Sequence, residues 1–165
     1  RRQHGQKNGT YMHASETTLT WGDNHVLGYT PMDDIHEEFV DLIGQMQVAS
    51  DAQLPELLNA MQAHLQSHFD EENLWMMETE FPPRDCHIEQ HDAVLKSVAE
   101  VQEVLAQGNV DVCRSLVAAL ADWFPGHATH LDSALAHWMC KRRLGGKPVV
   151  LRRMQPAELR GTDQE

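Results

Sequence analysis

Apolar residues recur at steps of three and four along most of the chain from about residue 30 to residue 140. This spacing places side chains on one face of an α-helix, whereas a strand would alternate apolar and polar residues. Four segments follow it, with Met32, Ile35, Phe39, Ile43 and Met46 in the first, Leu54, Leu58, Met61, Leu65 and Trp75 or Met76 in the second, Val94, Leu95, Val98, Val101 and Leu105 in the third, and Leu116, Leu120, Trp123, Leu131 and Leu135 in the fourth. The pattern predicts an all-α protein.

Prolines, glycines and a capping residue delimit these helices. Thr30 is expected to cap the first helix, with Pro31 at its first position. The stretch "SDAQLPE" separates the first helix from the second, and "EFPPRD" ends the second because the residue before a proline disfavours helix. The third is expected from about Pro83 to Gln107, ended by Gly108, and the fourth from "GNVD" to Gly145 and Gly146. The short connections predict an up-down-up-down four-helix bundle over residues 21–146, between a flexible segment at 1–20 and a C-terminal tail at 147–165.

The predicted buried faces also carry polar side chains. His87 and His91 lie four residues apart in "HIEQH", and the same steps lead on to Val94 and Leu95. A four-residue step turns about 400° around a helix, so both imidazoles are expected to face the core one turn apart. The other helices add His36 from the first, His68 and Glu72 from the second, and His127 and Asp132 from the fourth.

The fourth helix has two irregular features. His127 and Asp132 are five residues apart, so on an ideal α-helix their directions diverge by about 140°, and Asp132 is expected to reach sideways. Pro125 lacks the N–H that would bond to the carbonyl of Ala121, so we also expect a kink just before His127. A carboxylate that reaches sideways could bridge two metal ions.

Seven polar groups in one core favour a metal centre. A lone inward histidine such as His36 is more often a hydrogen-bonded core residue than a ligand. A buried carboxylate such as Glu72, however, is costly unless it is paired or bound to metal. Only a metal centre would satisfy all seven groups together. Five nitrogen and two oxygen donors exceed the four ligands of one tetrahedral zinc, and in a bundle core they favour two iron ions over manganese or zinc.

The chain resembles the bacterial hemerythrins, which are single-domain di-iron oxygen-binding proteins. The motifs that carry the resemblance are "MDDIH" ending at His36, "HFDEE" from His68, "HIEQH" from His87 and "HATHLD" from His127, and it extends from Trp21 to about Leu144. The resemblance implies that His87, His91 and His127 hold one iron and that His36 and His68 hold the other. Glu72 and Asp132 would bridge the two irons, with a hydroxide or oxide as a third bridge. Dioxygen would bind at the iron that has two histidines.

Five further residues are expected to line the oxygen pocket, namely Phe39, Phe69, Trp123, Phe124 and Ala128. For the aromatic residues, plain core packing is the alternative. Ala128 and Ile35 depart from the family, which usually has a larger aliphatic residue after the last histidine and often has Gln before the first. The smaller Ala128 is expected to leave a gap in the pocket wall.

Charge and composition exclude some functions. The net charge of −12 argues against nucleic acid as a partner, and no window approaches 18 consecutive apolar residues, so no membrane span is expected. The three cysteines, Cys86, Cys113 and Cys140, form no C-x-x-C pair and fit reduced thiols in a cytoplasm. Residues 141–165 hold seven of the thirteen basic residues against three acidic ones. Such residues favour a helix C-terminus, and a docking tail for an acidic protein partner is the alternative.

The resemblance to the bacterial hemerythrins implies a non-enzymatic protein that binds dioxygen reversibly, for carriage, storage or delivery. The first alternative is an enzyme with the same centre, such as an oxidase, a peroxidase or a nitric oxide reductase. The second is an oxygen or redox sensor module in which the basic tail provides the output.

Overall fold

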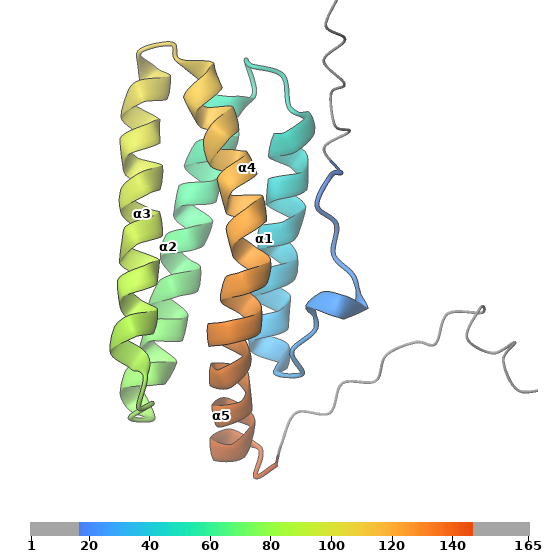
Figure 1. Cartoon of the computed structure of the whole chain (residues 1–165), viewed down its shortest axis with the longest axis vertical. Coiled ribbons are helices and arrows are strands. Elements are labelled where there is room, and N and C mark those ends of the chain that lie inside the picture. The colour runs from blue at the N-terminus through green and yellow to red at the C-terminus, as the bar shows by residue number, and fades with distance from the viewer. Residues whose placement is uncertain (1–16, 147–165) are drawn as a thin grey trace, which may run out of the picture.

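The computed structural model describes residues 17–146, which form an antiparallel bundle of four helical rods (Figure 1). The elements are the short 3-10 turn η1 (Asp23–His25), α1 (Thr30–Val48), α2 (Leu54–Glu78), α3 (Arg84–Ala106), α4 (Val110–His127), the π-helical turn η2 (Ala128–Asp132) and α5 (Ser133–Arg143). The last three follow one another without a break and make the fourth rod. α1 and α3 each pack against both α2 and α4. The predicted all-α four-helix bundle is confirmed, and residues 17–146 contain no strand.

The start of α1 differs from the expectation. Thr30 is the first helical residue, and the residue before it, Tyr29, provides no side-chain cap. Asp33 acts in the first turn instead, because its carboxylate accepts hydrogen bonds from the N–H of Leu27 at 2.7 Å and of Gly28 at 2.9 Å. Thr30 as the cap was therefore wrong. The carboxylate of Asp33 fixes the segment that leads into the helix.

The other helix ends lie within one or two residues of the predicted positions. α3 begins at Arg84, directly after the two prolines, and ends before Gly108, whose φ of 93° is a conformation that L side chains rarely adopt. Asn109 then caps α4, since its side-chain oxygen accepts the N–H of Val112 at 3.3 Å. These helix-terminating and helix-capping residues keep the connections short and the neighbouring helices antiparallel.

The segment before α1 lies along the bundle and contacts it. The N–H of Leu19 donates to the Gln47 side chain at 2.7 Å, and Leu19 and Trp21 pack against the core. Residues 1–16 and 147–165 lie outside the described part of the chain, so the predicted flexible N-terminal segment and basic tail fall largely there. Of the basic residues from 141 on, Arg142 lies over the ring of Trp138 and Arg143 donates to the hydroxyl of Tyr29 at 3.1 Å.

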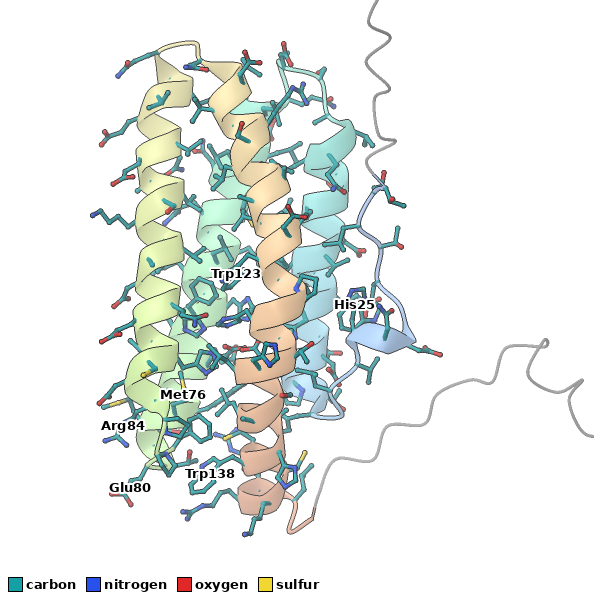
Figure 2. The ribbon with its side chains drawn as sticks, in the orientation of Figure 1. His25, Met76, Glu80, Arg84, Trp123 and Trp138 are labelled. Carbon is teal, nitrogen blue, oxygen red and sulfur yellow. The ribbon has the colours of Figure 1, made fainter. Side chains whose placement is uncertain are left out.

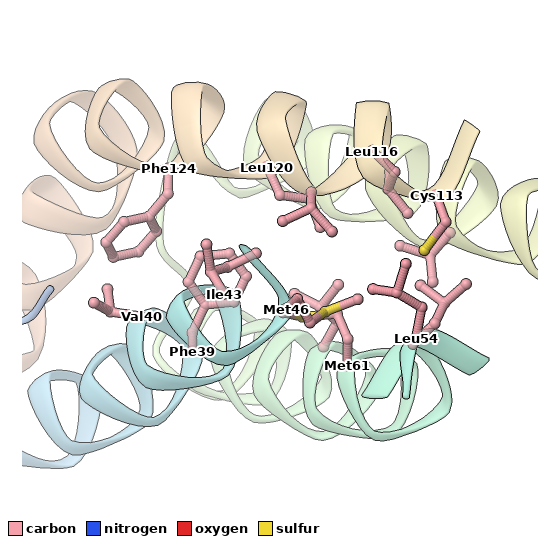
Figure 3. Packing of buried hydrophobic residues seen from close by; sticks show 14 of the residues in the cluster. Phe39, Val40, Ile43, Met46, Leu54, Met61, Cys113, Leu116, Leu120 and Phe124 are labelled. Atoms are coloured by element: carbon pink, nitrogen blue, oxygen red, sulfur yellow. The ribbon is translucent and has the colours of Figure 1, made fainter. Parts of the chain in front are cut away.

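The core has two apolar clusters. The larger runs from Phe39 and Phe124 to Leu54 and Cys113 (Figure 3), and it also includes Phe69. The smaller, around Met32, Trp75, Met76, Leu135 and Met139, occupies the end of the bundle near α5. Along α1, α2 and the fourth rod, the buried polar residues come between members of the two clusters in sequence. The polar layer is therefore closed off by apolar packing at both ends.

Two observations bear on membranes and disulfides. Among residues 17–146, no helix is both long enough and apolar enough to cross a membrane. All three cysteines are free, with Cys86 exposed and Cys113 and Cys140 buried.

Candidate metal centre

The predicted polar residues converge in the core. His36, His68, Glu72, His87, His91, His127 and Asp132 are all buried, with no more than 5 % of any residue exposed. Nitrogen- and oxygen-bearing side chains point into the bundle between the levels of Trp123 and Met76 (Figure 2). The chain thus brings together all seven residues that its sequence singled out. His130 and His137, by contrast, are exposed.

The convergent side chains form two groups that share a carboxylate. One atom each from Glu72, His87, His91, His127 and Asp132 lie within 4.8 Å of one another, and the same holds for His36, His68 and Glu72. Such spacing would allow each group to surround a cation. Since Glu72 belongs to both groups, two cations held there would be neighbours.

The two oxygens of Glu72 divide between the groups. Its Oε1 lies 3.0 Å from Nε2 of His68, one turn earlier on α2, and 3.4 Å from Nε2 of His36. Its Oε2 faces the other side and lies 3.5 Å from Nε2 of His87 and 3.3 Å from Nε2 of His91. One carboxylate therefore presents an oxygen to each histidine group.

Asp132 repeats this division from the opposite wall of the bundle. Its Oδ1 lies 2.9 Å from Nε2 of His87 and 3.1 Å from Nε2 of His127. Its Oδ2 lies 3.2 Å from Nε2 of His36. The two carboxylates thus span both groups.

The π-helical turn η2 explains how Asp132 reaches the centre. Residues 128–132 follow His127 directly, and a π-helix bonds residue i to residue i+5, which brings residues five apart close to one full turn. His127 and Asp132 therefore share a face, and the expected divergence of about 140° was wrong. The helix continues through Pro125, and the local irregularity is the wider turn three residues later. The same wider turn leaves Leu131, which was expected inside, only half-buried.

Two amides orient histidines of the larger group. The Oδ1 of Asn73 lies 2.8 Å from Nδ1 of His91, and the Oε1 of Gln90 lies 3.0 Å from Nδ1 of His127. Because a carbonyl oxygen only accepts, each Nδ1 carries the proton and donates, which leaves Nε2 with a free lone pair that faces the carboxylates. Sequence reasoning missed both amides. The only signal was their position directly beside Glu72 and His91.

Aromatic rings pack on the histidines. Phe69 stacks on His91 with ring centroids 4.0 Å apart and an interplanar angle of 5°, and Trp123 stacks on His127 at 4.3 Å. Phe69 also lies 5.0 Å from His68. Trp123 and Phe69 therefore pack against histidines of the three-histidine group, and Phe69 also contacts His68 of the other group.

The two-histidine group has different surroundings. Nδ1 of His36 and of His68 has no hydrogen-bond partner, a condition that His87 shares in the other group. The ring of Phe124 lies edge-on to His36 at 5.2 Å and 4.9 Å from the ring of Phe39.

Ala128 lies where the wall meets a surface groove. The residue is 6 % exposed. The groove has a volume of about 470 Å³, and its lining residues include Ala128, Pro125 and His25. The expected pocket residues thus lie around the centre, with the small Ala128 on its outer side.

The centre is electrically balanced without a cation only if histidines are protonated. Burial by itself lowers the pKa of His36 and His87, but hydrogen bonds to Asp132 and Glu72 and their charges outweigh it and raise the pKa to about 10 and about 9. Burial alone would raise the pKa of both carboxyls, yet the surrounding histidines hold it well below the usual range. Bound cations would replace these protons.

Unpaired buried atoms test whether a metal fits. Nε2 of His36 and of His91, Oε2 of Glu72 and both oxygens of Asp132 are buried without a hydrogen-bond partner. An unsatisfied buried polar atom costs about 1–3 kcal/mol. Cations between the two groups would satisfy all of these atoms at once, and a set of five nitrogens with two shared carboxylates suits a pair of ions.

Comparison with known proteins agrees with this geometry. Residues 27–138 match the family described as the hemerythrin HHE cation binding domain. Over 124 residues the chain is 36 % identical to a bacteriohemerythrin of Ralstonia nicotianae (strain ATCC BAA-1114 / GMI1000), a match that covers 75 % of this chain and 90 % of the relative. A bacteriohemerythrin of Stenotrophomonas maltophilia (strain R551-3) is 26 % identical over 122 residues, which cover 72 % and 79 % of the two chains. No solved structure matches the chain. The resemblance predicted from the four motifs is confirmed, and the chain belongs to the hemerythrin family of cation-binding domains.

Proposed function

We propose that this protein holds two iron ions in the buried centre and binds dioxygen reversibly there, for carriage, storage or delivery. The observation that carries the proposal is the division of Glu72 and Asp132, each of which turns one oxygen to either histidine group. His87, His91 and His127 would hold one ion, His36 and His68 the other, and the two carboxylates would bridge them with a hydroxide or oxide.

The asymmetry of the donor set gives the two ions different tasks. A pair of ferrous ions would supply two electrons to bound dioxygen and recover them when it is released. The group of His36 and His68 offers one nitrogen fewer than the other, so a small molecule is expected to bind on this side. The chain's task is to fix the seven donors and to keep water away from that position.

Aromatic side chains provide most of the water exclusion. Phe39, Phe69 and Phe124 are fully buried beside the two-histidine group, and their rings offer no strong hydrogen bond to water. Ala128 would be the weak point, because it is a small residue of the groove lining and directly follows His127. These residues would form the oxygen pocket.

The groove beside Ala128 favours a second candidate function. A protein that only carries oxygen benefits from a closed pocket, whereas an oxidase, a peroxidase or a nitric oxide reductase must admit a reactant. The groove is lined by Ala128, which directly follows His127, and by residues of the segment 17–27. An enzyme that uses the same ions is therefore the alternative.

Metal analysis and oxygen exposure test the proposal. The purified protein is expected to contain two irons per chain. The diferrous form, prepared without air, should develop a visible charge-transfer band on mixing with oxygen and lose it when argon removes the oxygen. His68→Ala, which removes a donor, should bind less iron and give little of this band. A band that decays with turnover of a co-substrate would favour the enzyme, and iron-free protein with a folded core would contradict both.

A further inference from the structure

A second surface groove, the α3–α4 groove, lies between α3 and α4 and is distinct from the groove beside Ala128. It has a volume of about 280 Å³ and a mostly apolar lining, which includes Gln90, Val94 and Ser97 from α3 and Leu116, Ala119 and Trp123 from α4. Figure 2 shows Trp123 projecting from α4 toward α3. The groove therefore gives one large aromatic side chain of the core region a place at the surface.

Two residues of the α3–α4 groove also contact a histidine of the centre. Trp123 stacks on His127 with ring centroids 4.3 Å apart and an interplanar angle of 28°, and the Oε1 of Gln90 lies 3.0 Å from Nδ1 of the same histidine. Trp123 is half-buried and Gln90 is exposed. By contrast, Phe69 and Phe124, which also pack on histidines of the centre, are fully buried. Trp123 thus joins the surface to His127.

Acidic side chains surround the α3–α4 groove. Exposed carboxylates flank its lining residues in the sequence, namely Glu89, Asp92 and Glu100 on α3 and Asp122 on α4. The two helices together carry seven acidic residues against three basic ones. Each of these three basic side chains lies beside a carboxylate, namely Arg84, Lys96 and Arg114. The groove is therefore an apolar patch with a negatively charged rim.

The charge of the rim selects the kind of partner. A negative rim attracts a surface with a positive rim, whereas it repels the same face of a second copy of this chain. The net charge of −12 acts in the same direction at longer range. Electron-transfer proteins commonly meet through small, transient interfaces of this kind. An electron that enters at this patch would have to cross only the indole of Trp123 to reach His127.

We propose that the α3–α4 groove is the docking site of a small electron-transfer protein with a basic rim, and that Trp123 passes electrons from it to the iron held by His127. This inference goes beyond the proposed function and rests on it, because it needs bound iron. Two donor proteins would each lose one electron, and the two ferric ions of the oxidised protein would each gain one. Docking would thus restore the diferrous form.

Electron exchange with cytochrome c, a basic protein with one haem, tests the docking site. The diferrous protein should pass one electron to each of two ferric cytochromes, by the same route in reverse. Ala119→Lys places a positive charge at an exposed lining position, and Val48→Lys, which adds the same charge at an exposed position of α1, is the matched control. At low salt, Ala119→Lys should raise the half-saturating cytochrome concentration on the order of fivefold, and the control should leave it nearly unchanged.

Changes at Trp123 test the route separately from the docking. Trp123→Leu removes the indole, so the limiting rate of electron transfer in the saturated complex should fall while the half-saturating concentration changes little. Trp123→Phe keeps a smaller ring and should give an intermediate rate at full iron content. Calorimetric titration of the air-oxidised protein with ferric cytochrome c, in which no electron moves, measures docking by itself. The affinity should fall in Ala119→Lys and not in Val48→Lys.

The possible results separate this inference from the proposed function. Equal half-saturation and equal calorimetric affinity in Ala119→Lys and Val48→Lys would overturn docking at the α3–α4 groove. Unchanged limiting rates in both Trp123 variants would overturn the route. Self-association of the unmodified protein that Ala119→Lys abolishes would assign the groove to a second copy and overturn the proposed partner. All three results leave the proposed function intact, whereas a protein that holds no iron would overturn both.

Discussion

The two histidine groups of the centre are built differently, although they share both carboxylates. Around His91 and His127, each Nδ1 is held by an amide and each ring is covered by a stacked aromatic. Around His36 and His68, neither Nδ1 has a partner, and the nearest rings stand edge-on or tilted. Two of the three histidines in the larger group are therefore fixed by amides, whereas neither histidine of the smaller group is.

We infer from this difference that the three-histidine group mainly retains its metal ion and that the two-histidine group mainly binds the small molecule. Hydrogen bonds behind a ligating histidine fix its orientation and raise its basicity, which favours tight retention of a metal ion. A group with fewer donors and an apolar border leaves room for a visiting molecule. We therefore expect changes at the three-histidine group to affect metal content first, and changes at the two-histidine group to affect ligand binding first.

Removal of a donor should have the largest effect. In His91→Ala the three-histidine group loses a buried nitrogen that lies 3.3 Å from Oε2 of Glu72, so the iron content should fall well below that of the unmodified protein. His130→Ala and His137→Ala, at exposed positions, should keep the full content. Metal analysis of the purified variants measures this. Full iron in His91→Ala would show that the histidine register is wrong.

Removal of the iron should destabilise the whole bundle. Iron held as proposed would bind the folded centre and scarcely the unfolded chain, so a ligand at about a thousand times its dissociation constant would add about 4 kcal/mol. For a domain of this size, that is on the order of 10 °C in melting temperature. Thermal unfolding followed by circular dichroism, with and without a chelator, measures the difference. Equal melting of the two forms would mean that the centre is not where the metal is bound.

A rise in pH should increase the difference in melting temperature between the iron-loaded and the metal-free protein. In the metal-free protein the pKa of His36 is raised to about 10 and that of His87 to about 9, above the value of 6.5 for a free histidine. The stability gained from these protonated rings is fully present below pH 6.5 and is lost as the pH rises toward 9 and 10. The melting temperature of the metal-free protein should therefore fall over this range, while iron-loaded protein, with neutral imidazoles, shows no such fall. Parallel curves for the two forms would contradict the charge balance inferred for the centre.

The amides behind the three-histidine group should have a smaller effect. Loss of an outer-shell partner typically costs 10–100-fold in metal affinity. Asn73→Leu and Gln90→Leu should therefore release iron to a chelator at lower concentration than the unmodified protein does. Gln102→Leu, whose amide bonds to Asn59 on the exposed surface, is the control. If the amide variants retain iron like the control, the two histidine groups do not differ in the way described.

The burial and convergence of the seven polar side chains could be predicted from the sequence because their spacing coincides with a buried stripe. His36, His68 and His91 lie at helical steps from apolar neighbours, so the argument that buries those neighbours also buries the histidines. Asn73 and Gln90 escape this argument, since a residue next to a stripe position is turned about 100° away from it. Their contact depends on how α2, α3 and α4 pack, which no periodicity reports.

The π-helical turn could not be predicted from periodicity either, for another reason. "HATHLD" has no composition that distinguishes a turn of five residues from one of four, and a register argument assumes the usual helix. The only sign is that both His127 and Asp132 need to face the core. The start of α1 is similar, because Thr30 is a good capping residue by type, while the hydrogen bonds go to Asp33, three residues on.

The pocket wall should give the smallest effect and the most direct measure of the two-histidine side. Ala128 lines the groove and directly follows His127, and a missing isobutyl-sized group leaves room for roughly one or two waters at about 30 Å³ each. If the protein binds dioxygen as proposed, entry of water, protons or anions would promote irreversible loss of the oxygenated form. Ala128→Ile and Ala128→Leu should therefore lengthen the lifetime of the oxygenated form by a few-fold. Phe69→Ser should shorten it, because it opens the wall beside His68 and His91.

Decay of the visible band at fixed pH and oxygen concentration measures this lifetime. Val48→Ala, at an exposed position far along α1 from His36, is the matched control for a change of aliphatic volume and should decay like the unmodified protein. Iron content and melting temperature must be equal for the comparison to report on water entry. If Ala128→Ile then decays at the unmodified rate, water does not enter through the groove. The assignment of Ala128 to the pocket wall would then be wrong.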